Sequence, residues 1–260
     1  MVKKMAKCGM IQSELDPCLL VSDTVIAVMY VDDILMWSTH EDHIYALGEL
    51  LRAEGVDLEE EDDAAGFLGV KLNKDAKTGQ MVMMQEGLID RIIQALGLDV
   101  DNSKPRNKPC LKTPLTKDLE GDPPQEQFSY PSVIGMLLYL SGHSCPNISY
   151  SVSCAARFAF CPKRSHEQAL KLIGRYLLAT RDKGLVLTPT RDLNIEAYPD
   201  SDFAGLWGHE DSLDPTSVRS RTGFVINVAN CPVLWKSMLQ SLTATSTMEA
   251  KIVALSTCCQ

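Results

Sequence analysis

The pattern of apolar positions predicts a hairpin followed by a helix near the start of the chain. Two apolar runs, 25–31 and 34–37, are rich in β-branched and aromatic residues and are separated only by the adjacent Asp32 and Asp33. Such runs around a two-residue break predict a hairpin with both aspartates at its turn. Apolar residues then recur at helical spacing over 41–52, which predicts a helix packed after the hairpin.

A second hairpin and a second helix are predicted next. The apolar segments 67–72 and 81–84 flank a turn at 77–79, and this arrangement is typical of a hairpin. Residues 88–96 have an apolar helical face, and Gly97 provides the stop.

Residues 99–127 are poor in apolar side chains and contain five prolines, so they predict a connector that runs over the surface. Beyond it, the spacing predicts helices over 130–140 and 148–160. The segment 165–168 has the form of a capping box, which predicts the start of a third helix at Ser165. These three helices would form a small helical layer.

After Gly184 the pattern changes to short strands and ends in a helix from about Met248, which indicates a separate α+β unit that begins near residue 190. The predicted strands are 185–187, 195–198, 223–228 and 233–235. The predicted fold class is therefore α+β, with four parts: 1–100, a linker at 101–128, a helical layer at 129–188 and a sheet with a helix at 189–260.

Composition indicates an ordinary globular chain. The 260 residues are 45% hydrophobic, which is enough to bury one or two cores. No stretch approaches the roughly 18 uninterrupted apolar residues of a membrane span, and no apolar signal core follows the N-terminus. The nine cysteines include no CxxC pair, and their odd number fits no disulfide framework. We expect an intracellular protein, in the cytoplasm, the nucleus or both, with reduced thiols and no membrane partner.

The net charge of −9 argues against a surface devoted entirely to nucleic acid, because phosphate binding usually requires a basic face. The charge is unevenly distributed, however. Much of the acidic excess lies at 54–63, whereas a basic stretch follows in the connector. That stretch consists of Lys104, Arg106, Lys108, Lys112 and Lys117.

The adjacent aspartates are the first candidates for chemistry. Asp32 and Asp33 hold like charges close together between apolar strands, so a cation is expected near them. Mg²⁺ prefers carboxylate oxygens and often bridges them to substrate phosphates, as in two-metal nucleotidyl transfer. On spacing alone an ordinary surface turn is the better explanation, since aspartate is a common turn residue.

The longer string around these aspartates changes that interpretation. Tyr30-Val31-Asp32-Asp33-Ile34-Leu35 resembles the catalytic hairpin of reverse transcriptases, and 12–19 resembles the copia-type retrotransposon polyprotein. The resemblance continues in one order along the chain. Its further blocks are 67–70, 130–140, 157–158, 166–184, 200–205, 221–224, 235–240 and 246–250.

The resemblance implies the end of a reverse transcriptase palm, a helical thumb or connection layer, and the start of a ribonuclease H domain with a mixed sheet. It implies that Asp32 is a catalytic metal ligand of the polymerase and Asp33 its neighbour. Asp200, at the end of a strand, and Glu249, on the following helix, would hold metal ions against an RNA phosphate. The implied cofactor is Mg²⁺, with Mn²⁺ as a substitute, and the implied partners are a primed RNA template and an RNA:DNA hybrid.

The sequence also departs from the family pattern. Lys251-Ile252 replaces the usual Glu-Tyr, and Cys145-Pro146-Asn147 replaces an Arg-Pro-Asp. An earlier palm carboxylate, the fingers domain and later ribonuclease H aspartates are not in this sequence. We therefore expect two incomplete sites and no turnover, because Mg²⁺ tolerates poor geometry badly. A non-catalytic nucleic-acid-binding remnant and a decayed gene product are the alternatives, and the oligomeric state stays open.

Two further residues are given structural roles. Asp202 is expected to be a solvated or structural aspartate beside Asp200. His166 lies at a predicted helix start with no second histidine nearby, so capping and packing are favoured over metal ligation.

Overall fold

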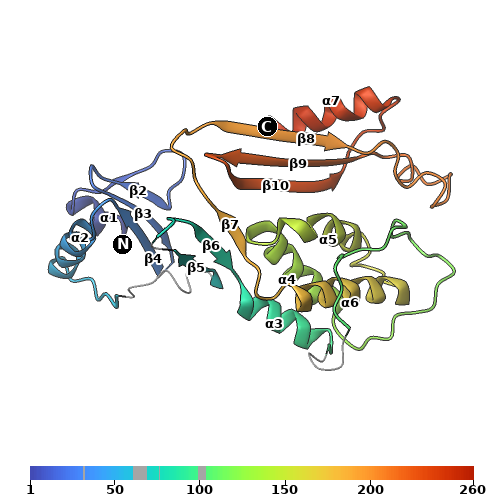
Figure 1. Cartoon of the computed structure of the whole chain (residues 1–260), viewed down its shortest axis with the longest axis horizontal. Helices are drawn as coiled ribbons and strands as arrows, with labels where there is room; N and C mark the ends of the chain where they lie inside the picture. The colour runs from blue at the N-terminus through green and yellow to red at the C-terminus, as the bar shows by residue number, and fades with distance from the viewer. Residues whose placement is uncertain (32, 61–68, 76, 99–103) are drawn as a thin grey trace. The chain divides into compact units, whose positions relative to one another are not determined.

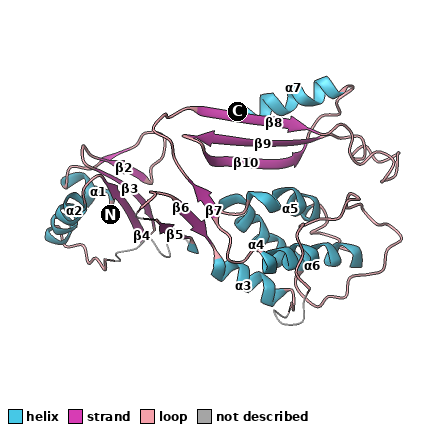
Figure 2. Cartoon of the chain, viewed as in Figure 1, coloured by secondary structure: helices cyan, strands magenta, loops and turns pink. Residues whose placement is uncertain are grey.

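The computed structural model describes residues 1–31, 33–60, 69–75, 77–98 and 104–260. Internal contacts divide the chain into two units, Met1–Lys71 and Leu72–Gln260. Each unit contains helices and antiparallel strands (Figure 1; Figure 2), which confirms the predicted α+β class. The predicted division at residues 100, 128 and 188 and the assignment of the parts to a palm and a ribonuclease H domain stay predictions.

The first unit is built on a four-stranded antiparallel sheet in the order β1-β2-β3-β4. Val25 and Ala27 of β3 are buried while Ile26 between them is exposed, which is the alternation of a strand with one covered face. Helix α2 packs against β4, so the predicted hairpin and helix are confirmed. The elements are α1 Val2–Lys7, β1 Ile11–Gln12, β2 Leu19–Val21, β3 Val25–Tyr30, β4 Asp33–Ser38 and α2 Glu41–Ala53.

The helical layer of the second unit surrounds the larger core. Leu170, Ile173 and Leu177 of one helix are fully buried at helical spacing, and the other helices contribute their own apolar faces to the same cluster. The predicted helices are confirmed, although the one predicted over 148–160 is a short 3-10 turn followed by a helix that ends at Ala156. The elements are α3 Glu86–Ala95, α4 Tyr130–His143, η2 Pro146–Ile148, α5 Ser149–Ala156 and α6 Arg164–Ala179.

A small sheet in the order β5-β6-β7 combines the second predicted hairpin with a distant strand. β5 Lys71–Lys74 and β6 Met81–Met84 are neighbours, which confirms the hairpin. The first strand was predicted over 67–72, but β5 begins at Lys71, and residues 67 and 68 lie outside the described residues. β7 Leu185–Leu187 then pairs antiparallel with β6, with Met83 opposite Leu185. Gly184 permits this approach, because a Cβ there would lie 2.6 Å from the Met83 carbonyl oxygen.

The third sheet is antiparallel, in the order β10-β9-β8. Its strands are β8 Ile195–Ser201, β9 Arg221–Val228 and β10 Cys231–Leu239, and helix α7 Thr247–Cys258 packs across β8 and β9. The mixed sheet expected here is therefore not observed among the described strands. The physical reason is that no crossover helix connects these strands, and parallel pairing needs such a crossover.

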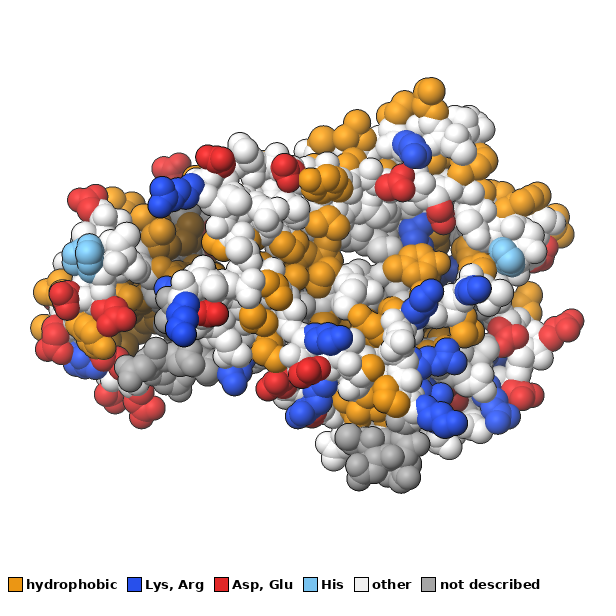
Figure 3. Space-filling model, in the orientation of Figure 1, with side chains coloured by type: hydrophobic (Ala, Val, Ile, Leu, Met, Phe, Trp, Pro, Cys, Tyr) orange, Lys and Arg blue, Asp and Glu red, His pale blue; other side chains and the backbone are white. Residues whose placement is uncertain are grey.

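Helix α7 is apolar on two sides. Ala250 and Ala254 are fully buried against the sheet, and their small side chains allow a close approach. Met248, Ile252 and Leu255 are exposed, and hydrophobic side chains gather over this helix in Figure 3. None of the helices in the described ranges is long and apolar enough to cross a membrane.

The connector at 104–128 has no helix or strand in its described residues, but it is fastened to α6. The Glu167 carboxylate accepts the backbone N–H groups of Gln125 and Glu126, at 2.7 and 3.0 Å. A surface connector was predicted. The structure shows in addition that its residues Gln125 and Glu126 are hydrogen-bonded to Glu167 of α6.

The start of α6 differs from the predicted capping box. The hydroxyl of Ser165 donates to the Asp118 carboxylate, 47 positions earlier, so Ser165 does not cap the helix. Lys163 is the N-cap residue, and its backbone N–H donates to Nδ1 of His166 at 2.8 Å. The predicted capping residue is wrong, whereas the predicted capping role of His166 is confirmed.

Acid is expected to destabilise the second unit through His166. The buried ring stacks on Phe158, donates from Nε2 to the Thr116 carbonyl at 2.8 Å, and needs an unprotonated Nδ1 to accept from Lys163. Burial lowers the pKa of His166 below its ordinary value of 6.5. The unfolded chain therefore binds more protons. The stabilisation is complete above pH 6.5 and is lost as the pH falls below it, by at most about 1.4 kcal/mol per pH unit.

Urea unfolding of the wild type between about pH 7 and about pH 5.5 measures this loss. His166→Asn cannot titrate in that range, so its free energy of unfolding should depend less on pH. If the variant and the wild type have the same pH dependence, His166 is not the group responsible.

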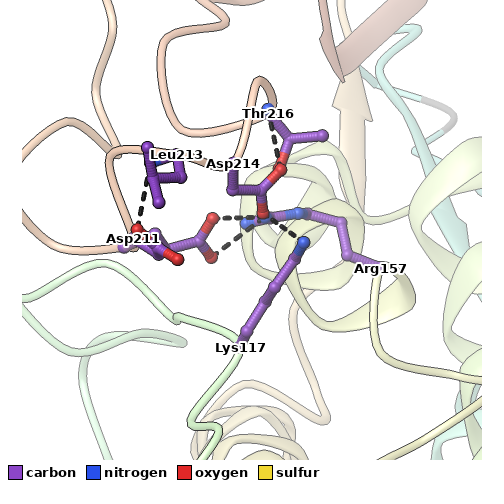
Figure 4. A network of polar contacts seen from close by, with 7 residues as sticks. Lys117, Arg157, Asp211, Leu213, Asp214 and Thr216 are labelled. Atoms are coloured by element: carbon purple, nitrogen blue, oxygen red, sulfur yellow. Dashed lines mark hydrogen bonds and ion pairs between the residues drawn. The ribbon is translucent and has the colours of Figure 1, made fainter.

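A polar network fastens the loop at 202–220 to the helical layer and to the connector (Figure 4). Nη2 of Arg157 donates to both carboxylate oxygens of Glu210, at 3.0 and 3.1 Å, in a largely buried pair. Lys117 donates to Asp214, which also accepts from Thr216 at 3.0 Å. These bonds, led by the one from Lys117, lower the pKa of Asp214 to about 2. Three segments far apart in the sequence are thereby held together.

Candidate functional site

The β3–β4 hairpin presents Asp33 near its tip. Tyr30 pairs with Asp33 at the end of the ladder, and Val31 in the turn has a φ of +55°. Asp33 is exposed and is the first residue of β4 rather than part of the turn. Asp32 lies outside the described residues. The hairpin is confirmed, and metal binding by Asp32 and Asp33 stays a prediction.

Asp200 lies near the end of β8, opposite Gly223 of β9. Its exposed carboxylate is 3.3 Å from the ammonium of Lys251 on α7. A hydrogen bond from the Ser201 backbone and the nearby Lys251 hold the pKa of Asp200 below its usual range. The Asp200 carboxylate is therefore ionised, and it forms an ion pair with Lys251.

Glu249 lies in the first turn of α7, where it takes part in the helix start. Its backbone N–H donates to the hydroxyl of the N-cap residue Ser246 at 3.1 Å. Its carboxylate accepts from the backbone and the hydroxyl of Thr245, at 2.6 and 2.7 Å. These bonds from Thr245 lower the pKa of Glu249. The sequence Ser246 to Glu249 thus makes a capping arrangement, which places the carboxylate at the helix start.

The structure brings α7 against β8 and joins the two elements by Lys251, two residues after Glu249. Across the described ranges, no group of three or more His, Cys, Asp or Glu side chains could hold a metal ion. Mg²⁺ needs several oxygen ligands in nearly octahedral geometry. As arranged, Asp200 and Glu249 do not form such a site, because Lys251 is paired with the Asp200 carboxylate and Thr245 donates hydrogen bonds to the Glu249 carboxylate. Their roles as metal ligands stay predictions.

A cleft of about 430 Å³ lies between this sheet and the start of α5. Asp200 and Asp202 line it from β8 and the adjoining loop. Asp202 accepts a hydrogen bond from the backbone N–H of Arg221, which agrees with the structural role expected for it. Sequence reasoning assigned no role to Arg221 and Tyr150, which also line this cleft. Arg221 opened one of the recognised blocks, but nothing in the sequence indicated that it would be buried.

Comparison with known proteins finds relatives over nearly the whole chain. The retrovirus-related Pol polyprotein from transposon TNT 1-94 of Nicotiana tabacum is 28% identical over 253 residues, which cover 92% of this chain and 18% of that protein. The retrovirus-related Pol polyprotein from transposon RE1 of Arabidopsis thaliana is 27% identical, over 94% of this chain and 16% of that protein. The chain therefore spans less than a fifth of the length of these curated relatives.

A shorter relative matches part of the chain. The secreted RxLR effector protein 161 of Plasmopara viticola is 33% identical over 127 residues, which cover 49% of this chain and 84% of that protein. No protein-family model matches the sequence, and no solved structure matches the fold.

Proposed function

We propose that this chain, which belongs to the retrovirus-related Pol polyproteins of transposons, supplies the segment from the reverse transcriptase palm into the ribonuclease H domain. The observation that carries the proposal is the packing of α7, with Glu249 in its first turn, against β8, which bears Asp200. Carboxylates on a strand end and on the adjoining helix suit a domain that acts on phosphodiesters with divalent metal ions. In the parent polyprotein the substrates would be a primed RNA template and an RNA:DNA hybrid.

For this chain by itself we favour nucleic-acid binding without turnover. The Lys251 ammonium next to Asp200 and the Thr245 bonds to Glu249 engage the two carboxylates that would have to hold metal. The basic stretch of the connector supports binding, because Lys104 and Arg106 are exposed there. This second candidate, a non-catalytic binding module, is therefore the better description of the separate chain.

The purified chain is expected to bind an RNA:DNA hybrid without cleaving it, and to extend no primer on an RNA template with either Mg²⁺ or Mn²⁺. Binding should weaken steeply with salt, because each phosphate contact releases counterions. Lys251→Ala removes the positive charge next to Asp200 and should raise Mn²⁺ affinity by about tenfold. Fluorescence anisotropy, gel assays of cleavage and extension, and Mn²⁺ titration calorimetry measure these quantities.

Lys3→Ala, which removes an exposed charge from α1, is the matched control for the calorimetry and should leave Mn²⁺ affinity unchanged. Turnover that disappears in Asp32→Asn or Asp200→Asn would overturn the expectation of inactivity. The absence of hybrid binding even at low salt would overturn the proposed function.

A further inference from the structure

Arg221 carries a buried positive charge that forms no ion pair with a carboxylate of the described residues. The residue is 8% exposed and lines the cleft beside β8. Its Nη1 donates to the hydroxyls of Ser153 and Ser237, at 2.7 and 3.5 Å, and its guanidinium lies 5.4 Å from the centre of the Tyr150 ring. No ion pair joins it to an acidic side chain in the described part of the chain. An unpaired buried charge is costly, so an anion in the cleft would be stabilised there.

The two aspartates of the same cleft are engaged elsewhere. Asp200 is paired with Lys251, and Asp202 accepts the backbone N–H of Arg221 rather than its guanidinium. The hydroxyl of Ser201, which also lines the cleft, is buried without a hydrogen-bond partner. The guanidinium of Arg221 is therefore the charged group of this cleft that a ligand with several oxygen acceptors would neutralise.

A second cleft of about 420 Å³ adjoins the first, because Pro146 of η2 lines both. Arg106 of the connector and Lys183 after α6 line this second cleft, and both are exposed. The amide side chains of Asn107 and Asn147 are there as well, and none of the described residues that line this cleft carries a carboxylate. The second cleft is thus a basic pocket with neutral hydrogen-bonding groups.

We infer that the two clefts form one path for the sugar-phosphate backbone of a nucleic-acid strand. One phosphate would lie at Arg221, and further phosphates would lie at Arg106 and Lys183 beyond η2. A guanidinium suits this task because its donors match phosphate oxygens in pairs. The cationic positions on both sides of Pro146 favour a polyanion over a small anion, which would fill one cleft only. The inference rests on the proposed function and names the surface that performs it.

Aromatic residues of the first cleft support a nucleic acid over other polyanions. Tyr150 and Tyr198 are partly exposed along its wall, and Trp235 is fixed by a hydrogen bond from Nε1 to the Ser141 carbonyl at 2.6 Å. Aromatic rings beside a basic groove give bases a surface on which to stack.

Arg221→Gln is expected to weaken binding of a labelled RNA:DNA hybrid by about tenfold and to reduce the slope of log affinity against log salt by about one. The exposed pair Arg106→Gln/Lys183→Gln should reduce the slope by about two. Anisotropy titrations at several salt concentrations measure both. Arg91→Gln/Arg191→Gln removes two exposed cations that line neither cleft and should leave the slope unchanged.

Near-ultraviolet circular dichroism of each variant checks that the fold is intact, and the exposed pair keeps the test decisive if Arg221→Gln unfolds. If Arg221→Gln, Arg106→Gln/Lys183→Gln and the control all bind the hybrid as strongly as the wild type does, the proposed path is wrong. The proposed function is then unaffected. A wild type that does not bind at all would overturn both. An equal loss in the Arg91 and Arg191 control would mean that overall charge, and no particular path, determines binding.

Discussion

Glu210→Ala is expected to lower the free energy of unfolding of the second unit by about 3–5 kcal/mol. The Glu210 side chain is 1% exposed, and both of its oxygens accept from Arg157. Its removal leaves a largely buried guanidinium without a counter-charge, and Nη1 of Arg157 already lacks a hydrogen-bond partner. Urea unfolding measures the loss. The variants are made in a Trp37→Phe background. The remaining tryptophans, Trp207 and Trp235, both lie in the second unit, so tryptophan fluorescence then follows the unfolding of that unit.

An exposed ion pair in the same unit is the matched control. Arg164 and Asp122 lie 3.4 Å apart with side chains 47% and 72% exposed, so Asp122→Ala should cost only about 0–1 kcal/mol. Replacing the buried pair by Arg157→Met/Glu210→Leu should recover much of the loss, because no charge is then left buried alone. If Glu210→Ala costs no more than Asp122→Ala, the buried pair does not hold the loop at 202–220.

The elements that sequence predicted best are those defined by close neighbours in the chain. Helix α2 begins at Glu41 as expected, because the residues of one apolar face follow one another every three or four positions. The β3–β4 hairpin needs only two apolar runs and a two-residue gap, and Tyr30 does pair with Asp33. In both cases the physical information lies within about a dozen residues.

The elements that sequence could not predict depend on distant partners. The three residues of β7 carry no sign that they pair with Met81–Met84, about a hundred positions earlier. Ser165 has the right chemistry for an N-cap, but its hydroxyl donates to Asp118. The helix begins at Arg164, and Lys163 is its N-cap residue. Tertiary contacts decided both outcomes.

The candidate site shows the same division. Asp200 and Glu249 could be selected from the motif strings, since the resemblance fixes residue identity and order. The pairing of Lys251 with Asp200 depends on how closely α7 approaches β8, and the burial of Arg221 depends on where α5 lies. Local residue spacing predicts neither the approach of α7 to β8 nor the position of α5. Both determine which charges face a ligand of this site.

Leu51→Ala is expected to unfold the first unit at room temperature or bring it close to unfolding. Leu51 is fully buried in a core cluster that contains eight buried residues of the described part of this unit. Truncating such a side chain costs about 2–5 kcal/mol. A unit of this size has a total stability of roughly 4–10 kcal/mol, so the loss is a large fraction of it. Hydrogen exchange with mass spectrometry should show lost protection in β3 and α2. The hairpin that carries Asp33 would lose its order with them.

Leu50→Ala is the control, because the same side chain is removed one position away, where it is 52% exposed; its effect should stay within about 0.5 kcal/mol. Within the described ranges, the core clusters of the two units share no residue. Peptides around Leu137 should therefore keep their protection in Leu51→Ala. Equal protection of α2 in both variants would contradict the assigned core. Loss of protection around Leu137 would mean that the two clusters unfold as one cooperative body, and that the hairpin's order depends on the whole chain.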